Sequence, residues 1–385
     1  MARTLTAAEK LDWLQLARSG GVGPRTFFKL LDRFGSARRA FEELPRLARE
    51  AGAEDQWRRC RRDEAEAELD ALEKLGCELI ARDEPGYPQR LAEIADPPPV
   101  LTLRGRMELL SAPGIAIIGA RNASANGRLF AKNLANELAA GGLVVVSGLA
   151  RGIDTAAHEG ALAAGGATVA VIASGIDVPY PEDNAALMAE IAEVGAVVTE
   201  RPLGAVPQAR HFPRRNRLIS GLSLGVLVVE AAPNSGSLIT ARLAAEQGRE
   251  VMAVPGSPLD PRHRGTNQLL RDGATLVESA DDVRAALGPF ELAPKAPPNP
   301  RRTTTPRRSR PAESPPPARP AAPPPTDGDL ASRVRERLGP EPLLVDELIR
   351  QCHASTAEVQ RALLELELEG RIERHPGNRV SLALA

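Results

Sequence analysis

Cysteine is scarce in this chain of 385 residues, which contains only Cys60, Cys77 and Cys352. Because they are odd in number and widely spaced, they indicate neither a disulfide framework nor a zinc site, and inert thiols in a reducing compartment are expected. Long apolar runs are missing too, since none approaches the roughly 18 residues of a membrane helix. The start, MARTLTAAEK, lacks the apolar core of a signal peptide. These absences predict a cytoplasmic protein without a membrane span.

Net charge is also nearly absent. The sequence has 49 Lys and Arg against 50 Asp and Glu, so no global basic field marks the chain as a nucleic-acid-binding protein. A local basic patch could still do so, because binding depends on how the charges are distributed. The length allows two or three domains.

The chain is organised around residues 114–160. An apolar run ends at Gly119, a polar turn and a helical pattern follow, and a second apolar run ends at Ser147. The helix is predicted to carry Leu129, Leu134 and Leu138 on one face. Further strands are predicted at residues 168–172, 196–199, 226–229 and 251–254, with helices between them. This alternation predicts an α/β fold with an extended Rossmann-like, doubly wound, mostly parallel sheet over residues 76–288.

Residues 1–75 are predicted to form an N-terminal all-α domain. Helices flank the Gly-Val-Gly turn at 20–24, which resembles a helix-hairpin-helix or SAM-like unit whose free amides could hold a DNA phosphate. Alternatively, these glycines only make the turn between packed helices. Residues 54–75 are predicted to be a charged helix with a solvated face, with Leu69, Leu72 and Leu75 on its other side. Residues 77–105 are predicted to be a connector with two short strands.

Two segments follow the α/β region. Residues 289–328 are rich in proline and arginine and are predicted to form an extended, flexible linker. Residues 329–385 read as three helices followed by two pairable strands, which is the pattern of a winged-helix domain. The third helix carries Glu358, Glu365 and Glu367, which suit contact with phosphates poorly. A protein-interaction role and a DNA-reading role therefore both stay open.

Four polar segments follow strands of the predicted sheet and should meet at one edge. Arg121 follows the first strand, where a guanidinium beside helix-start amides can grip a phosphate; alternatively it pairs with Asp154. The other segments are the glycine-bearing loop 147–152, the arginine cluster at 212–217 and the helix start at 234–237. Together they predict a cleft for several phosphates, unless the cluster instead pairs with acidic residues of the protein itself.

Signatures of catalysis and cofactors are missing. The turn after the first strand is not GxGxxG, and Ser147-Gly148 stands where a ribose-binding acid would follow the second strand, which disfavours NAD and FAD. The sequence has no P-loop and no GxSxG, and His158 and His211 lie far from any metal-ligand spacing. Binding without a cofactor, a metal or a catalytic residue is therefore predicted.

Motifs in order along the chain resemble the DNA-processing protein A family (DprA, also called Smf). They are IAIIGAR, VVVSGLARGID, FPRRNRLIS, VLVVEA, SGSLITARLAAEQGREVMAVPG and GTNQLLRDGA. The resemblance spans roughly residues 77–285. It implies a protein that binds single-stranded DNA, dimerises through residues 251–274, and helps load the RecA recombinase on incoming DNA during natural transformation.

The strand-end argument and this resemblance together assign a set of residues to the DNA-binding groove. They are Gly119, Arg121, Ser147, Gly148, Arg151, Arg215, Asn216, Arg217, Asn234, Ser235, Gly236, Ser237, Pro255 and Asn267. The family usually has lysine where this chain has Asn234, so phosphate attraction is expected to be weaker at that point.

Two other functions stay open. The first is a nucleotide phosphoribohydrolase on a related sheet, although this chain has PNSGSLIT at 233–240 and lacks the paired glycines and catalytic glutamate of the PGGxGTxxE segment. The second is a scaffold whose α/β domain only presents the winged helix to a partner.

Overall fold

The computed structural model describes residues 3–50, 52, 58–289, 330–339 and 342–383. The chain divides into two compact units, Met1–Leu292 and Ala293–Ala385, each described here by itself. The predicted linker at 289–328 lies, apart from residue 289, outside the described residues. The domain boundaries inferred from the sequence stay predictions.

A nine-stranded sheet occupies the centre of the first unit within the described residues, in the order β1-β2-β6-β5-β4-β3-β7-β8-β9. The strands are β1 (Glu78–Ala81), β2 (Val100–Gly105), β3 (Gly114–Ile118), β4 (Val144–Ser147), β5 (Thr168–Val171), β6 (Ala196–Thr199), β7 (Gly225–Val228), β8 (Glu250–Ala253) and β9 (Thr275–Leu276). Neighbours from β6 to β9 pair in parallel, whereas β1 and β2 are antiparallel additions at one edge. The predicted doubly wound, mostly parallel sheet is confirmed.

The strand order reverses between β3 and β7. Strands β4, β5 and β6 follow β3 on one side, and the chain then returns to place β7 on the other side of β3. In open α/β sheets, ligands bind beyond the carboxyl ends of the strands at such a reversal. The Arg121 turn follows β3 at this point.

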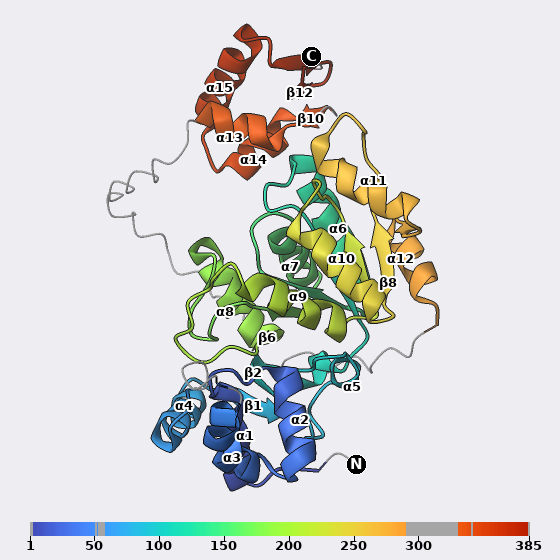
Figure 1. Ribbon diagram of the computed structural model, residues 1–385. Helices are drawn as coiled ribbons and strands as arrows, with labels where there is room; N and C mark the ends of the chain where they lie inside the picture. The colour runs from blue at the N-terminus through green and yellow to red at the C-terminus, as the bar shows by residue number, and fades with distance from the viewer. Residues whose placement is uncertain (1–2, 51, 53–57, 290–329, 340–341, 384–385) are drawn as a thin grey trace, which may run out of the picture. The chain divides into compact units, whose positions relative to one another are not determined.

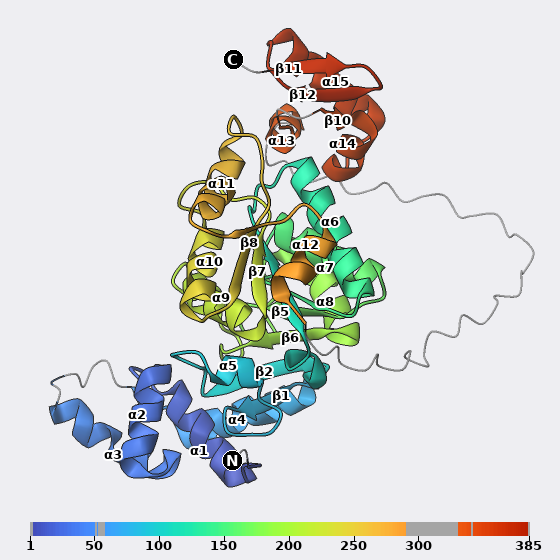
Figure 2. The same cartoon turned by 90° about the vertical axis from the view of Figure 1, so that its right-hand side faces the viewer.

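Helices cover both faces of the sheet, as Figure 2 shows. Helices α6 (Ala125–Ala140), α7 (Ile153–Ala163) and α12 (Ala280–Leu287) pack on the face that buries Ile115, Ile117 and Val145. Helices α9 (His211–Leu222) and α10 (Gly236–Glu246) pack on the opposite face, against Ala116 and Ile118. The remaining helices of this region are α5 (Gln89–Ala92), α8 (Ala185–Val194) and α11 (Arg264–Arg271). Because both faces are buried, the strands read as continuous apolar runs.

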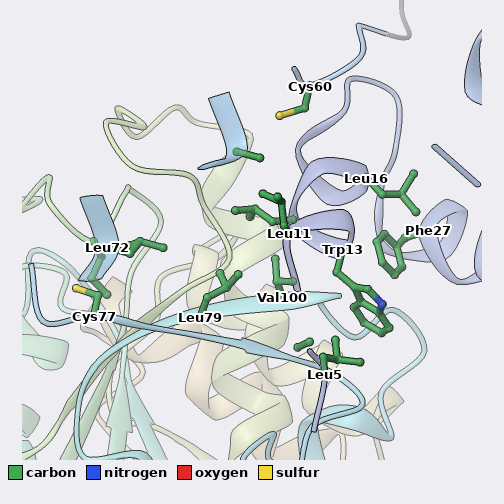
Figure 3. Packing of buried hydrophobic residues seen from close by; sticks show 14 of the residues in the cluster. Leu5, Leu11, Trp13, Leu16, Phe27, Cys60, Leu72, Cys77, Leu79 and Val100 are labelled. Atoms are coloured by element: carbon green, nitrogen blue, oxygen red, sulfur yellow. The ribbon is translucent and has the colours of Figure 1, made fainter. Parts of the chain in front are cut away.

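The N-terminal helices share a core with the edge of the sheet (Figures 1 and 3). They are α1 (Ala7–Arg18), α2 (Pro24–Phe34), α3 (Ala37–Glu50) and α4 (Arg62–Lys74). Leu11, Trp13 and Phe27 belong to the same buried cluster as Leu79 of β1 and Val100 of β2. The predicted connector at 77–105 therefore forms one edge of the sheet, and the N-terminal helices pack against it.

Three details differ from the sequence-based predictions. Leu129 is 39% exposed, whereas Leu134 and Leu138 are buried. The reason is that five residues along an α-helix turn the side chain by about 140°, so Leu129 cannot share the face of Leu134. Leu75 is also exposed, because α4 ends at Lys74, before it. Strand β9 was not predicted, since its two residues are too short to show a pattern.

The second unit contains the predicted winged helix. Helices α13 (Leu330–Arg337), α14 (Val345–Cys352) and α15 (Thr356–Leu368) precede the hairpin of β11 (Ile372–His375) and β12 (Arg379–Leu382), and β10 (Leu343–Leu344) pairs with β12. Glu367 of α15 pairs with Arg374 at 2.8 Å. Leu364 and Leu368 are exposed on the same helix. This surface is acidic and apolar, in keeping with the protein-interaction alternative.

Candidate functional site

Helix α9 joins the segments that the sequence singled out, at the carboxyl edge of the sheet. The guanidinium carbon of Arg121, in the turn after β3, lies 4.9 Å from the centre of the Phe212 ring at the start of α9. One turn further along, Asn216 Nδ2 donates a hydrogen bond to the Gly236 carbonyl at 3.3 Å, at the start of α10. Residues four apart lie on the same face of a helix, so the turn after β3 and the start of α10 both contact one face of α9 rather than separate surfaces.

Arg121 is exposed and makes no salt bridge within the described residues. The alternative pairing with Asp154 is not formed. The Asp154 carboxylate instead accepts hydrogen bonds from the backbone amides of Gly148 and Ala150, at 3.1 and 3.4 Å. The guanidinium of Arg121 is consequently available to an anion in solution.

An aromatic pair accompanies Arg121. The rings of Tyr180 and Phe212 lie 5.8 Å apart with an interplanar angle of 54°, and Tyr180 is 44% exposed. Arg121, Phe212 and Tyr180 thus form a continuous surface of flat side chains, which we call the Arg121–Phe212 surface. The sequence analysis did not assign either ring to the site. The sequence did contain a signal for these two rings. This chain has only 2 Tyr and 7 Phe, so an aromatic residue in a segment that follows a strand is unusual here and indicates a possible binding residue.

The arginine cluster at 212–217 is mostly inside the fold. Arg217 is 5% exposed and pairs with Glu200 and, at 3.2 Å, with Asp96. Arg215 is also buried, and its Nη1 donates to the Val171 carbonyl at 3.2 Å. Burial lowers the pKa of Arg215 to about 10, with Asp154 acting in the opposite direction, so the side chain stays cationic at neutral pH. Arg217 is thus placed as a residue of the fold, as the self-pairing alternative proposed.

Exposed positive charge comes instead from Arg210 and Arg214, before and within the first turn of α9. Burial is the main cause that lowers the pKa of His211, and the nearby charges of Arg201, Arg210 and Arg214 lower it further. His211 Nε2 lies 3.0 Å from Arg201 Nη2. The start of α9 therefore carries a solvent-facing cationic group close to Phe212.

The loop after β4 rests on Arg215. A Cβ added to Gly148 would lie 1.4 Å from Arg215 Nη1, so a larger residue here would have to displace the Arg215 guanidinium. Ser147 is fully buried and its Oγ donates to the Ile117 carbonyl at 2.7 Å. Arg151 is exposed and pairs with Asp183 at 2.8 Å. Ser147 and Gly148 therefore shape the site, while Arg151 is the member of this loop that faces solvent.

The remaining assigned residues follow β7 and β8. Asn234 is exposed with a φ of 65°, and Ser235 caps α10 by accepting a hydrogen bond from the Ser237 amide at 3.3 Å. Asn267 holds the Gly256 backbone with two hydrogen bonds, of 2.8 and 3.2 Å, so its amide is already occupied. Three others surround these residues: Gly119 and Pro255 are half-buried and Gly236 is exposed.

Glu230, which follows β7, holds the turn that carries Arg121. It is fully buried, and its carboxylate accepts hydrogen bonds from the backbone amide of Ser124 at 2.9 Å and from the Ser124 hydroxyl. Ser124 Oγ in turn accepts from the Gly127 amide at 2.9 Å and caps α6. His263 Nε2 lies 3.8 Å from the same carboxylate. The sequence analysis did not assign Glu230, because its partners are distant in sequence.

Ser124→Ala should lower the free energy of unfolding by about 2 kcal/mol, because it removes a helix cap and one hydrogen bond to a buried carboxylate. Chemical denaturation of the full chain measures this. Ser279→Ala is the matched control, since Ser279 caps α12 from an exposed position without a buried partner. Equal losses for the two variants would contradict a structural role for the Ser124–Glu230 contact.

The described part of the chain carries neither a metal-binding cluster nor a membrane-spanning helix. There, no group of three or more His, Cys, Asp or Glu side chains could hold a metal ion. His158 is fully buried against Thr168 and does not reach the site surface. No helix among the described residues is both long and apolar enough to span a membrane.

Comparison with known protein families gives matches over most of the chain. The model described as DNA recombination-mediator protein A matches residues 78–288. A DprA-like N-terminal HHH domain matches residues 7–71, and a DprA winged helix domain matches residues 315–378.

Individual proteins are similar over the same regions. Protein Smf of Escherichia coli is 39% identical over 330 residues, covering 84% of this chain and 82% of that protein. The X-ray structure of DNA processing protein A from Streptococcus pneumoniae matches with a TM-score of 0.60 at 35% identity, covering 73% of this chain and 98% of that one. A structure describing the single-stranded DNA binding mode of DNA processing protein A from Helicobacter pylori matches with a TM-score of 0.50 at 32% identity, covering 54% and 93%.

Proposed function

Since the chain belongs to the DNA recombination-mediator protein A family, we propose that it binds single-stranded DNA at the carboxyl edge of its sheet. The observation that carries this proposal is the exposed, unpaired guanidinium of Arg121 against the Phe212 ring, with Tyr180 beside it. A cation for the phosphates and flat apolar faces for the bases are the two elements of sequence-independent single-strand binding. The relative from Helicobacter pylori, described by its single-strand binding mode, supports the same function.

Contacts at this edge divide into two kinds. Arg121, Arg151 and the two exposed arginines at the start of α9 would contact phosphates. Phe212 and Tyr180 would stack on bases. Arg215 and Asn216 would not contact the DNA directly. They would position the site, since Arg215 contacts the loop after β4 and Asn216 bonds the start of α10. Because phosphate contacts release counterions, binding should weaken as salt is added.

Arg121→Ala should weaken binding of a single-stranded oligonucleotide about tenfold, because one charge-assisted phosphate contact is lost. Fluorescence anisotropy at several salt concentrations measures this, and the slope of log affinity against log salt should become shallower by about one. Arg242→Ala is the matched control, since Arg242 is an exposed arginine of α10 paired with Glu246 four residues on. Unchanged affinity for Arg121→Ala, or equal binding of duplex and single strands, would contradict the proposal.

We also propose that the chain forms a dimer through residues 251–274 and loads a RecA-type recombinase on the bound strand in natural transformation. The description of the family model as a recombination mediator supports the loading step. Leu259, 67% exposed in this segment, offers an apolar contact for a second copy. Sedimentation analysis of Leu259→Glu, which should yield monomer, tests the dimer. Strand exchange by RecA with and without the protein tests the loading.

Catalysis is not part of this proposal. The phosphoribohydrolase alternative requires a glutamate and paired glycines that the segment at 233–240 lacks. Incubation with nucleoside monophosphates should therefore release no free base, and release of base would overturn this part of the proposal. The scaffold alternative predicts that a chain without residues 289–385 no longer binds DNA, whereas our proposal predicts that it still does.

A further inference from the structure

Helix α15 of the second unit (Figure 1) has two apolar faces. One face carries Val359, Leu363 and Leu366, which are buried in the core of the winged helix. The other faces solvent, where Leu364 is 52% and Leu368 is 80% exposed. A helix on the surface of a soluble domain ordinarily buries one apolar stripe and turns a polar face to water. The fold of this unit therefore does not account for the second apolar face.

The exposed face has the spacing of a surface that packs against another helix. Ala357, Arg361, Leu364 and Leu368 follow one another at intervals of four, three and four residues, and all four are exposed. This is the spacing of the a and d positions of a coiled coil, which places successive residues on one side of the helix. We call these four residues the α15 stripe. A helix laid along the stripe would remove both leucines from water, which is favourable.

Unpaired acidic residues border the stripe on one side. Glu358 and Glu365 are seven residues apart, and each directly follows a residue of the stripe, so both lie along the same border. Both are exposed, and neither makes a salt bridge within the described residues, although Glu358 accepts hydrogen bonds from Ser355 at the helix start. On the opposite border, Glu367 is paired with Arg374 at 2.8 Å. The free negative charge therefore lies along one border only.

This charge does not stabilise the helix that carries it. Glu365 lies in the last turn of α15, which contains no basic residue. The negative end of the helix dipole disfavours a carboxylate there. A carboxylate beside two exposed leucines is thus unfavourable for the isolated unit, and both features become favourable only when a partner covers them.

Two occupants of the stripe are disfavoured by its charges. In a parallel pair of α15 helices, position a faces position a, so the two Arg361 side chains would lie side by side. In an antiparallel pair the same border of each helix meets, so Glu358 and Glu365 of one copy would face those of the other. Like charges placed opposite each other suppress a pairing. The same carboxylates repel phosphates, which disfavours DNA.

We propose that the α15 stripe binds an amphipathic helix of a partner protein, one whose apolar face is bordered by lysine or arginine. The apolar side chains of the partner would cover Leu364 and Leu368, and its basic border would face Glu358 and Glu365. Recognition through the apolar face of an amphipathic helix is a recurrent mode of protein association. The inference concerns the second unit alone and does not depend on single-strand binding at the sheet edge.

Two synthetic helical peptides serve as probes of the full chain. They share one leucine stripe and differ only in the residues that border it, which are lysines in one peptide and glutamates in the other. Fluorescence anisotropy should show the lysine peptide binding about tenfold more tightly than the glutamate peptide, since several charge pairs each contribute a little.

Variants of exposed residues, which leave the fold of the unit intact, locate the binding surface. Leu368→Ala should weaken binding of the lysine peptide about tenfold, because it removes an apolar contact at the centre of the interface. Glu365→Lys should weaken it about threefold and should strengthen binding of the glutamate peptide. Leu344→Ala is the matched control, since Leu344 is an exposed leucine of β10 outside the stripe, and it should bind as the wild type does.

Three results would overturn the inference. The first is a lysine peptide that does not bind, or binds no better than the glutamate peptide. The second is an equal loss of affinity in Leu344→Ala and Leu368→Ala. The third is an effect of Leu368→Ala on the sedimentation of the protein without peptide, or on binding of a DNA duplex, because it would assign the stripe to a second copy or to nucleic acid.

A measurement without any variant uses a carbodiimide, which joins lysine amines to carboxylates that lie in contact. Cross-links from the lysine peptide to Glu358 or Glu365, identified by mass spectrometry, support the site. Cross-links confined to acidic residues of the first unit contradict it.

Discussion

Gly152→Ala should lower the free energy of unfolding by about 3 kcal/mol and weaken single-strand binding at the same time. Gly152 precedes α7 with a φ of 85° and a ψ of −120°, a conformation that side chains with a Cβ rarely adopt. A Cβ at this position would also lie 2.3 Å from the Ala120 carbonyl oxygen and 2.6 Å from that of Arg121. Both neighbours are backbone atoms, so no rotation of a side chain relieves the contact.

The expected loss has two parts of similar size. The positive φ of this position costs an alanine about 1 to 2 kcal/mol, and forcing backbone atoms apart in a packed region costs about as much again. Functionally, the displaced atoms belong to the turn that carries Arg121. We therefore expect affinity for a single strand to fall in Gly152→Ala under native conditions, where the protein is still folded.

Gly165→Ala is the matched control for this prediction. Gly165 has a φ of 64° and no atom within 4 Å of its hypothetical Cβ. It should show the backbone cost alone, with DNA affinity unchanged. Denaturant titration and fluorescence anisotropy on both variants decide the matter. If the two variants lose the same stability and neither loses affinity, then the close approach of the loop after β4 to the Arg121 turn does not support the site.

Much of the fold could be predicted from the sequence because its central strands are buried on both faces. The apolar runs at Ile115–Ile118 and Val144–Val146 are uninterrupted, and each is followed by glycine or serine. Both the strands and the positions where they end could therefore be predicted from the sequence. The helix face of Leu129 was wrong because a spacing of five residues was accepted where three or four is required. The order of the strands in the sheet could not be predicted, because β3 pairs with β7 and these strands lie about 110 residues apart in sequence.

The site was predictable as a location but not in the role of each residue. Turns that follow parallel strands meet at one edge by geometry, so Arg121 and the start of α10 could be brought together from the sequence. Whether an arginine faces solvent or the interior depends on partners elsewhere in the chain. Arg217 is buried because it forms ion pairs with Glu200 and Asp96, and no pattern in the sequence around Arg217 predicts these partners. Phe212 and Tyr180 were missed because an aromatic residue suits a buried core as well as a binding surface, and only the structure shows that Tyr180 is exposed beside Phe212.

Acid should destabilise the first unit through His158. This side chain is fully buried, and burial, with a smaller contribution from Arg215, lowers its pKa from the ordinary 6.5 to about 3. Thr168 Oγ1 donates its single proton to the Val145 carbonyl at 2.6 Å, so His158 Nδ1, 2.7 Å from the same oxygen, must be the donor to it. Nε2 is then unprotonated, and it has no hydrogen-bond partner among the described residues. A proton added there would place a charge and an unmatched N–H in the interior.

The direction of the pH effect follows from these two pKa values. Below pH 6.5 the unfolded chain binds a proton at His158, whereas the folded chain does not until the pH approaches 3. The contribution of the neutral His158 to the free energy of unfolding is therefore fully present above pH 6.5 and is lost as the pH decreases toward 3. The slope should reach about 1.4 kcal/mol per pH unit, which amounts to roughly 3 kcal/mol between pH 6.5 and pH 4. Denaturant titrations at several pH values measure the loss. His158→Gln keeps an N–H for Thr168 without a titrating group, so its stability should depend on pH less steeply by one proton. An imidazole signal of His158 that titrates near pH 6.5 in the NMR spectrum of the folded protein would contradict this account, because it would show that the buried ring accepts a proton as readily as the unfolded chain does.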